Sequence, residues 1–262
     1  MADEGLKQRQ GAMWGSAPYE RVAGAIADIH ERVVERLDPR RGRRWLDLAC
    51  GTGAVAELAA GRGADVIGVD LAPALIETAR QRAAELGLAI DYRVGDCERL
   101  ELPDGSFDVV SSTCGVMFAP DHAATARELA RVTRPGGRIA LANWTPAGGV
   151  ARMFSMMAPF QPASPPHNPF DWGDVRHVSA LLGEHFELGL EEHTSTFRVP
   201  SGEAYWERYS TSYGPTKTLA DSLGDRREEL HRTWVEFFES EYRANDEIVH
   251  AREYLLVVGE RL

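Results

Sequence analysis

The pattern of apolar and polar positions alternates between strand-like and helix-like segments along the first half of this chain. Short apolar runs typical of buried strands occur at 46–48, 64–69, 90–95, 107–111 and 138–144. Helical spacing or helix-start signals fall between them, at 54–60, 73–86 and 123–133. Strands that alternate with helices predict a parallel sheet whose strands are joined by right-handed helical crossovers.

The second half is less regular. Five prolines between 159 and 169 exclude a regular helix or a central strand there, which predicts a surface loop or lid. A helix near 174–182 and a strand near 188–198 follow, and the last apolar run, 253–259, predicts a buried strand that completes the sheet.

Two stripes of aromatic residues lie between these strands. Tyr205, Tyr209 and Tyr213 recur every four residues, with Trp206 beside them, and such a stripe forms either core packing or a ligand wall. The second stripe is expected in the core and consists of Trp234, Phe237, Phe238 and Tyr242.

The run from Leu46 to Ala54 carries the main candidate chemistry. Its apolar strand meets an acid and two glycines, Gly51 and Gly53, which allow a tight turn and a close approach of the backbone to a ligand. Further acids end the next two strands, so Asp47, Asp70 and Asp96 are expected to face one crevice at the carboxyl edge of the sheet. Carboxylates there can accept hydrogen bonds from ribose hydroxyls and from an adenine amino group.

Five ordered segments together resemble the class I S-adenosylmethionine-dependent methyltransferases, in particular the small-molecule branch that includes ubiquinone and menaquinone C-methyltransferases. The resemblance covers about residues 43 to 145, and its segments are 46–53, 69–71, 95–96, 102–110 and 131–138. It implies an α/β fold with a doubly wound, mostly parallel seven-stranded sheet and inserted lid helices, in which the last strand is an antiparallel edge insertion.

The resemblance also implies a cofactor, S-adenosylmethionine, with S-adenosylhomocysteine as the product. Ala49 to Gly53 would line the methionine moiety, Asp70 the ribose, and Asp96 with Cys97 the adenine. Thr113 would lie at the methionine amino end. The complete set of expected cofactor-binding residues is Asp47, Ala49, Cys50, Gly51, Gly53, Asp70, Leu71, Asp96, Cys97 and Thr113.

The expected organisation is a flexible N-terminus, 1–12, followed by a single methyltransferase domain, 13–262. Within that domain we expect an N-terminal cap helix over 13–37, a cofactor-binding core over 43–145, and a substrate lid or insert over 146–250 that is mixed with later core elements.

Composition limits the function classes. A net charge of -11 argues against a nucleic-acid partner, and the basic run 40–44 is interpreted as a solvated turn. No apolar stretch approaches the ~20 residues that span a membrane, which favours a cytoplasmic protein without a membrane partner. Three cysteines without a paired motif predict neither a disulfide framework nor a metal site. All three follow strand ends and should approach the cofactor crevice.

The acceptor residues are sought among apolar and aromatic side chains outside the motifs. Trp14, Tyr19, Met117, Trp144 and Tyr209 are the candidates for a small apolar or aromatic acceptor. Trp14 either closes the pocket or fixes the first helix to the sheet.

No catalytic residue is named. Methyl transfer from a sulfonium depends mainly on positioning and desolvation, and a general base is needed only for an acceptor that stays protonated. His122 and His167 are candidate bases, although each is more typical of an ordinary surface histidine.

The preferred function is S-adenosylmethionine-dependent methyl transfer to oxygen, carbon or nitrogen of a small molecule. An NAD-dependent oxidoreductase would match the glycine turn, and a noncatalytic S-adenosylmethionine-binding regulatory protein would keep the fold. A monomer and a homodimer are both compatible with the sequence, because the aromatic segments could form a lid or an interface.

Overall fold

The computed structural model describes residues 4–161 and 167–262. Its centre is a mostly parallel sheet in which seven strands follow one continuous order, with the two-residue β7 (Arg243–Ala244) added on β8. The order is β3 (Ile90–Val94), β2 (Asp65–Asp70), β1 (Arg44–Leu48), β4 (Phe107–Thr113), β5 (Thr133–Trp144), β8 (Glu247–Arg261) and β6 (Phe186–Val199). The predicted doubly wound, seven-stranded fold is confirmed.

The last strand is antiparallel, as expected, but its expected place at the edge is wrong. β8 pairs with β5 from Trp144 to Arg138 on one side and with β6 over the whole length of β6 on the other. Because β6 is fourteen residues long and pairs throughout, it covers β8 and becomes the edge strand itself.

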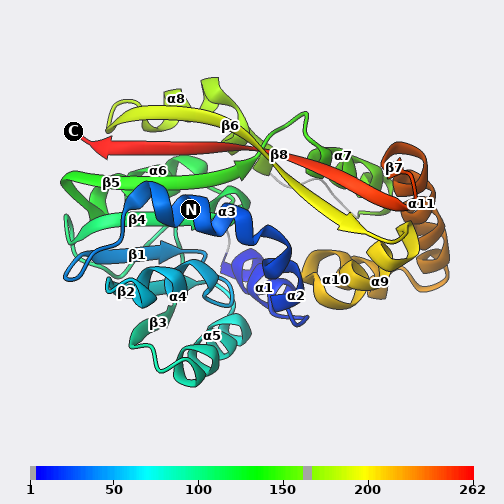
Figure 1. Ribbon diagram of the computed structural model, residues 1–262, viewed down its shortest axis with the longest axis horizontal. Helices are drawn as coiled ribbons and strands as arrows, with labels where there is room; N and C mark the ends of the chain where they lie inside the picture. Colours follow the sequence, from blue (N-terminus) through cyan, green and yellow to red (C-terminus); the bar gives the residue numbers. More distant parts are fainter. Residues whose placement is uncertain (1–3, 162–166) are drawn as a thin grey trace.

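Helices cover both faces of the sheet. α3 packs with α4 on one face and α6 packs with α8 on the other, while β6 and β8 extend beyond the other strands toward α9, α10 and α11 (Figure 1). The helices are α1 (Glu4–Trp14), α2 (Glu20–Ala23), α3 (Ala27–Leu37), α4 (Ala54–Gly61), α5 (Pro73–Glu85), α6 (His122–Val132), α7 (Gly149–Met157), α8 (Val175–Leu182), α9 (Gly202–Ser212), α10 (Gly214–Ser222) and α11 (Arg227–Glu241). Short 3-10 turns are η1 (Gly24–Ile26), η2 (Val116–Phe118), η3 (Ala158–Phe160), η4 (Pro169–Gly173) and η5 (Gly224–Arg226).

The N-terminal region differs from its prediction in two ways. Residues 4–14 form helix α1, where a flexible segment was expected over 1–12. The expected cap helix over 13–37 is divided, because α2, η1 and α3 follow one another instead of one continuous helix. Polar side chains dominate α1, so it shows little of the apolar periodicity on which sequence-based prediction of a helix depends.

The inserted region contains both core and loop. Tyr205 is fully buried against Phe238 and Trp234, with ring centroids 4.1 and 5.6 Å apart, so the first aromatic stripe partly serves as core. Of the five prolines, Pro159 lies in η3 and Pro169 begins η4, while the other three lie in 162–166, outside the described residues.

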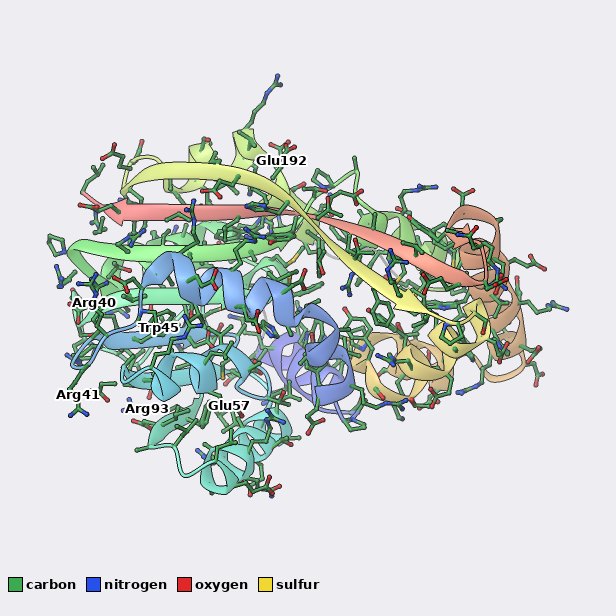
Figure 2. The ribbon with its side chains drawn as sticks, viewed as in Figure 1. Arg40, Arg41, Trp45, Glu57, Arg93 and Glu192 are labelled. Atoms are coloured by element: carbon green, nitrogen blue, oxygen red, sulfur yellow. The ribbon has the colours of Figure 1, made fainter. Side chains whose placement is uncertain are left out.

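Two properties expected from composition can be compared with the structure. The basic run before β1 is a turn, where Arg40 pairs with Asp38 and the Arg40 and Arg41 side chains lie at the outer margin of the molecule (Figure 2). In the described part of the chain, no helix combines the length and the apolar character needed to cross a lipid bilayer.

Candidate functional site

The glycine turn after β1 places backbone against a cavity. The chain leaves the strand through Ala49, Gly51 and Gly53, whose φ angles are +50°, +55° and +91°. A Cβ atom on Gly53 would lie 2.2 Å from the Tyr92 hydroxyl oxygen, so the turn can pack on this tyrosine only if residue 53 has no side chain. The turn then leads directly into α4.

Asp70 ties this turn to the next helix. Its Oδ2 accepts a hydrogen bond from the Gly51 N–H at 2.9 Å, and its Oδ1 accepts one from the Ala72 N–H at 2.8 Å. Burial raises the pKa of the Asp70 carboxyl, although these hydrogen bonds act in the opposite direction. Each carboxylate oxygen has a second lone pair, which leaves capacity for a ligand hydroxyl.

Asp47 lies deeper, at 2% exposure. Its Oδ1 accepts a hydrogen bond from Ser111 Oγ at 2.7 Å, and Ser111 Oγ in turn accepts one from Trp45 Nε1 at 2.8 Å. Burial raises the pKa of Asp47 to about 7, because the hydrogen bonds offset only part of the desolvation of the charged form.

The cofactor cavity, as we call it, opens above these residues. It offers about 1020 Å³ of space, counting its open mouth, and nine of the ten expected cofactor-binding residues line it: Asp47, Ala49, Cys50, Gly51, Asp70, Leu71, Asp96, Cys97 and Thr113. Gly53 does not line this cavity and instead packs on Tyr92, on the far side of the turn. All three cysteines line it, as expected, and burial raises their thiol pKa values.

One buried side-chain polar atom of the cofactor cavity has no hydrogen-bond partner among the described residues. Thr113 Oγ1 is buried and makes no hydrogen bond to a described residue. Buried polar atoms are rarely left unpaired, so a ligand with polar groups fits this wall. The methionine moiety of S-adenosylmethionine carries such groups.

Helix α1 supplies a wall of which the sequence predicted only Trp14. Lys7 forms ion pairs with Asp96 and Glu98, and Gln10 Nε2 donates to the Phe118 carbonyl at 3.3 Å. Lys7, Gln10 and Trp14 all line the cofactor cavity. The helix therefore lies over the loop that follows β3.

A second cavity, here called the acceptor cavity, adjoins the first. It has a volume of about 400 Å³, counting its open side, and shares Tyr19, Ile26, Cys114 and Phe118 with the cofactor cavity. Its other aromatic walls come from distant elements: Trp144 on β5, Tyr209 on α9 and Tyr213 at the end of α9.

The five expected acceptor residues have three different positions. Tyr19, Trp144 and Tyr209 line the acceptor cavity, and Trp14 lines only the cofactor cavity. Met117 is fully buried in the core and lines neither cavity, so the structure does not bring it together with the other four. Trp14 lines the cofactor cavity, and its ring packs on neighbouring rings outside the sheet, including Phe118 of η2 at a centroid distance of 4.9 Å.

The candidate bases do not lie at the site. His122 and His167 line neither cavity, and His122 Nδ1 lies 3.1 Å from His177 Nε2. A histidine that sequence analysis missed, His30, does line the cofactor cavity, and burial lowers its pKa to about 4. Its spacing of four from Ile26, which lines both cavities, is the signal that could have identified it.

Comparisons with known proteins agree with this geometry. A family described as a methyltransferase domain matches residues 46–141. An uncharacterized protein of Mycobacterium tuberculosis is 35% identical over 268 residues, which cover 99% of this chain and 96% of that protein. Malonyl-[acyl-carrier protein] O-methyltransferase of Serratia marcescens is 39% identical over 121 residues, 46% of either chain.

A solved structure with the same fold is that of a putative methyltransferase from Bacillus halodurans C-125. It superimposes with a TM-score of 0.62 at 20% identity, covering 88% of this chain and 97% of the other. The narrower branch suggested by the sequence, that of the ubiquinone and menaquinone enzymes, is not confirmed by these comparisons.

Proposed function

This chain belongs to the S-adenosylmethionine-dependent methyltransferases, and on that premise we propose that it methylates a small apolar or aromatic molecule bound in the acceptor cavity. S-adenosylmethionine is its cofactor, which removes the nicotinamide alternative. One observation carries the proposal: the cofactor cavity and the acceptor cavity share a wall made of Tyr19, Ile26, Cys114 and Phe118. An acceptor in the second cavity would lie next to a cofactor in the first.

We assign the cofactor contacts along the strand ends. Asp70 would accept hydrogen bonds from the ribose hydroxyls with its free lone pairs, and Asp96 with Cys97 would lie at the adenine. Thr113 and the turn from Ala49 would hold the methionine moiety. The unpaired Thr113 Oγ1 and the open backbone of the turn support this orientation.

The protein's own contribution would be positioning and exclusion of water. S-adenosylmethionine supplies an already activated methyl group, so the cavity needs to hold the acceptor atom in line and close to it. Trp14 and Tyr19, whose rings lie 6.1 Å apart, form an aromatic wall of the cofactor cavity, and Tyr19 also lines the acceptor cavity. We favour oxygen as the acceptor atom, because relatives matching about half of the chain are named as O-methyltransferases.

Calorimetric titration tests the cofactor assignment. Purified protein is titrated with S-adenosylmethionine, S-adenosylhomocysteine and NAD in parallel. We expect micromolar binding of the two sulfur nucleosides and none of NAD. Transfer of a labelled methyl group to members of a panel of phenols and small acids then tests the acceptor class, and transfer only to proteins or nucleic acids would contradict it.

We further propose a cytoplasmic protein that works as a monomer or a homodimer with a small-molecule acceptor and no nucleic-acid partner. The charge of -11 supports the last point. Sedimentation with and without S-adenosylhomocysteine would distinguish the two oligomeric states.

A further inference from the structure

A buried arginine lines the acceptor cavity. Arg252 lies on β8 and is 1% exposed. Its Nη2 donates to the Ala25 carbonyl at 2.5 Å and to Ser195 Oγ at 2.9 Å. Its guanidinium also lies over the rings of Phe197 and Trp144, at 5.0 and 5.7 Å from their centroids.

The charge of Arg252 has no direct anionic partner. Among the residues that the structure describes, no carboxylate lies within 4.0 Å of the guanidinium. Asp28 is connected to Arg252 only through Ser195, whose Oγ is 3.0 Å from Asp28 Oδ1. The Nε atom of Arg252 is buried without any hydrogen-bond partner, and Nη1 donates to no described residue.

Such an arrangement is costly for a protein unless a ligand completes it. A buried cation without a counter-ion loses hydration that neutral carbonyl and hydroxyl oxygens replace only in part. Both Nη2 hydrogens already have acceptors, so Nε and Nη1 carry the N–H groups that remain for a carboxylate, each as a charge-assisted hydrogen bond. The net charge of -11 makes the molecule as a whole repel anions, so a local cation is the feature that would let an anion bind.

We propose that the acceptor is a small aromatic or apolar acid whose carboxylate pairs with Arg252 in the acceptor cavity. This inference rests on the proposed function and narrows its substrate class. The rings of Trp144, Tyr209 and Tyr213 provide the apolar walls for the remainder of the acid.

Matched pairs of an acid and its amide test the proposal on the natural protein. The chain, saturated with S-adenosylhomocysteine, is titrated with salicylate against salicylamide, 4-hydroxybenzoate against 4-hydroxybenzamide, and 1-naphthoate against 1-naphthamide. We expect at least one acid to bind tenfold or more tightly than its amide, in the range of a charge-assisted hydrogen-bond pair. Equal binding within every pair, or no binding of any acid, would overturn the proposal.

Variants assign any preference to this side chain. Arg252→Gln should remove the preference for the acid, and Arg252→Lys should keep part of it because the charge remains. The matched control is Ser195→Ala. This variant removes one hydrogen-bond partner of Arg252, but Ser195 does not line the acceptor cavity, so the protein should keep its preference for the acid. An acid preference that persists in Arg252→Gln would contradict the assignment.

Affinity for S-adenosylhomocysteine, measured in the same titrations, separates this inference from the proposed function. If the chain binds S-adenosylhomocysteine but treats acids and amides alike, the inference fails and the methyltransferase assignment stands. If S-adenosylhomocysteine does not bind, the proposed cofactor contacts fail first. Where Arg252→Gln does not fold, the acid and amide pairs on the natural protein decide the question.

Discussion

The cofactor cavity and the acceptor cavity are built in different ways. The polar part of the cofactor cavity comes from the glycine turn and from acids at the ends of β1 and β2 and just beyond β3, while α1 and the segment from α2 to α3 add further walls. The acceptor cavity takes its walls from α2, β5, the region of α9, and β8, which are far apart in the sequence. Local motifs therefore place the polar residues of the first cavity, while tertiary packing places nearly all of the second.

The two cavities also differ in how their charges are satisfied. In the cofactor cavity, both oxygens of Asp70 accept backbone hydrogen bonds before any ligand is present. In the acceptor cavity, Arg252 is held by neutral oxygens and by aromatic rings. This difference makes the cofactor cavity preorganised for binding and leaves the charge of the acceptor cavity to be matched by a ligand.

The largest effect is expected where the cofactor cavity depends on backbone shape. Gly53→Ala places a Cβ atom in contact with the Tyr92 ring at a residue with φ of +91°. Backbone strain and overpacking together should lower the free energy of unfolding by about 2–4 kcal/mol. Urea unfolding followed by circular dichroism measures the loss.

Gly87→Ala is the matched control for that change. Gly87 has φ of +66°, but nothing lies within 4 Å of its added Cβ, so the variant carries backbone strain without a clash. We expect a loss of about 1–2 kcal/mol. If the two variants are equally unstable, the contact with Tyr92 does not shape the turn.

The second effect concerns the buried acid beneath the cofactor cavity. The pKa of Asp47 is raised to about 7, so the folded protein holds this proton more tightly than the unfolded chain does. The contribution of this proton to the free energy of unfolding is fully present at pH values below the ordinary pKa of a carboxyl group. As the pH rises from that ordinary pKa to 7, the contribution falls by about 1.4 kcal/mol per pH unit.

Comparison with Asp47→Asn isolates this titration. The variant has no proton to lose at residue 47, so the natural protein should lose stability relative to it between pH 5 and pH 7. Urea unfolding of both proteins at the two pH values gives the difference. Parallel pH profiles would mean that Asp47 ionises with an ordinary pKa.

The third effect tests the ribose contact. Asp70→Ala should weaken S-adenosylhomocysteine binding by about 1–3 kcal/mol, because it removes charge-assisted hydrogen bonds. We also expect Asp70→Ala to lower the free energy of unfolding, because the Gly51 and Ala72 N–H groups lose their hydrogen-bond acceptor. Calorimetry on Asp70→Asn, which keeps an oxygen acceptor, separates the lost charge from the disturbed turn.

Asp65→Ala provides the control on the same strand. Asp65 lies at the opposite, exposed end of β2, outside the cofactor cavity. We expect its affinity for S-adenosylhomocysteine to equal that of the natural protein. A comparable loss of affinity in both variants would mean that Asp70 does not bind the ribose.

What the sequence could predict follows the same division between the two cavities. The acids and glycines of the cofactor cavity lie at strand ends, and parallel strands bring such ends to one edge, so nine of ten expected residues line it. Arg252 gave no such signal, because its place opposite Tyr19 and Trp144 depends on the pairing of β8 between β5 and β6. An apolar side chain near a strand end can face the core as readily as a cavity, and Met117 is buried in the core.

The smallest effect concerns helix α1, where sequence reasoning expected no structure. Lys7 pairs with Asp96 and Glu98, so Lys7→Met leaves two neighbouring carboxylates without a cation at the end of the cofactor cavity where we propose that adenine binds. We expect a loss of about 1 kcal/mol in S-adenosylhomocysteine affinity, in the range of one partly buried ion pair.

The control is Lys217→Met, which removes an exposed ion pair with Asp221 and should leave the affinity for S-adenosylhomocysteine unchanged. Because the effect is electrostatic, it should shrink in 0.5 M salt, and a loss that salt does not change would mean that Lys7 acts through packing.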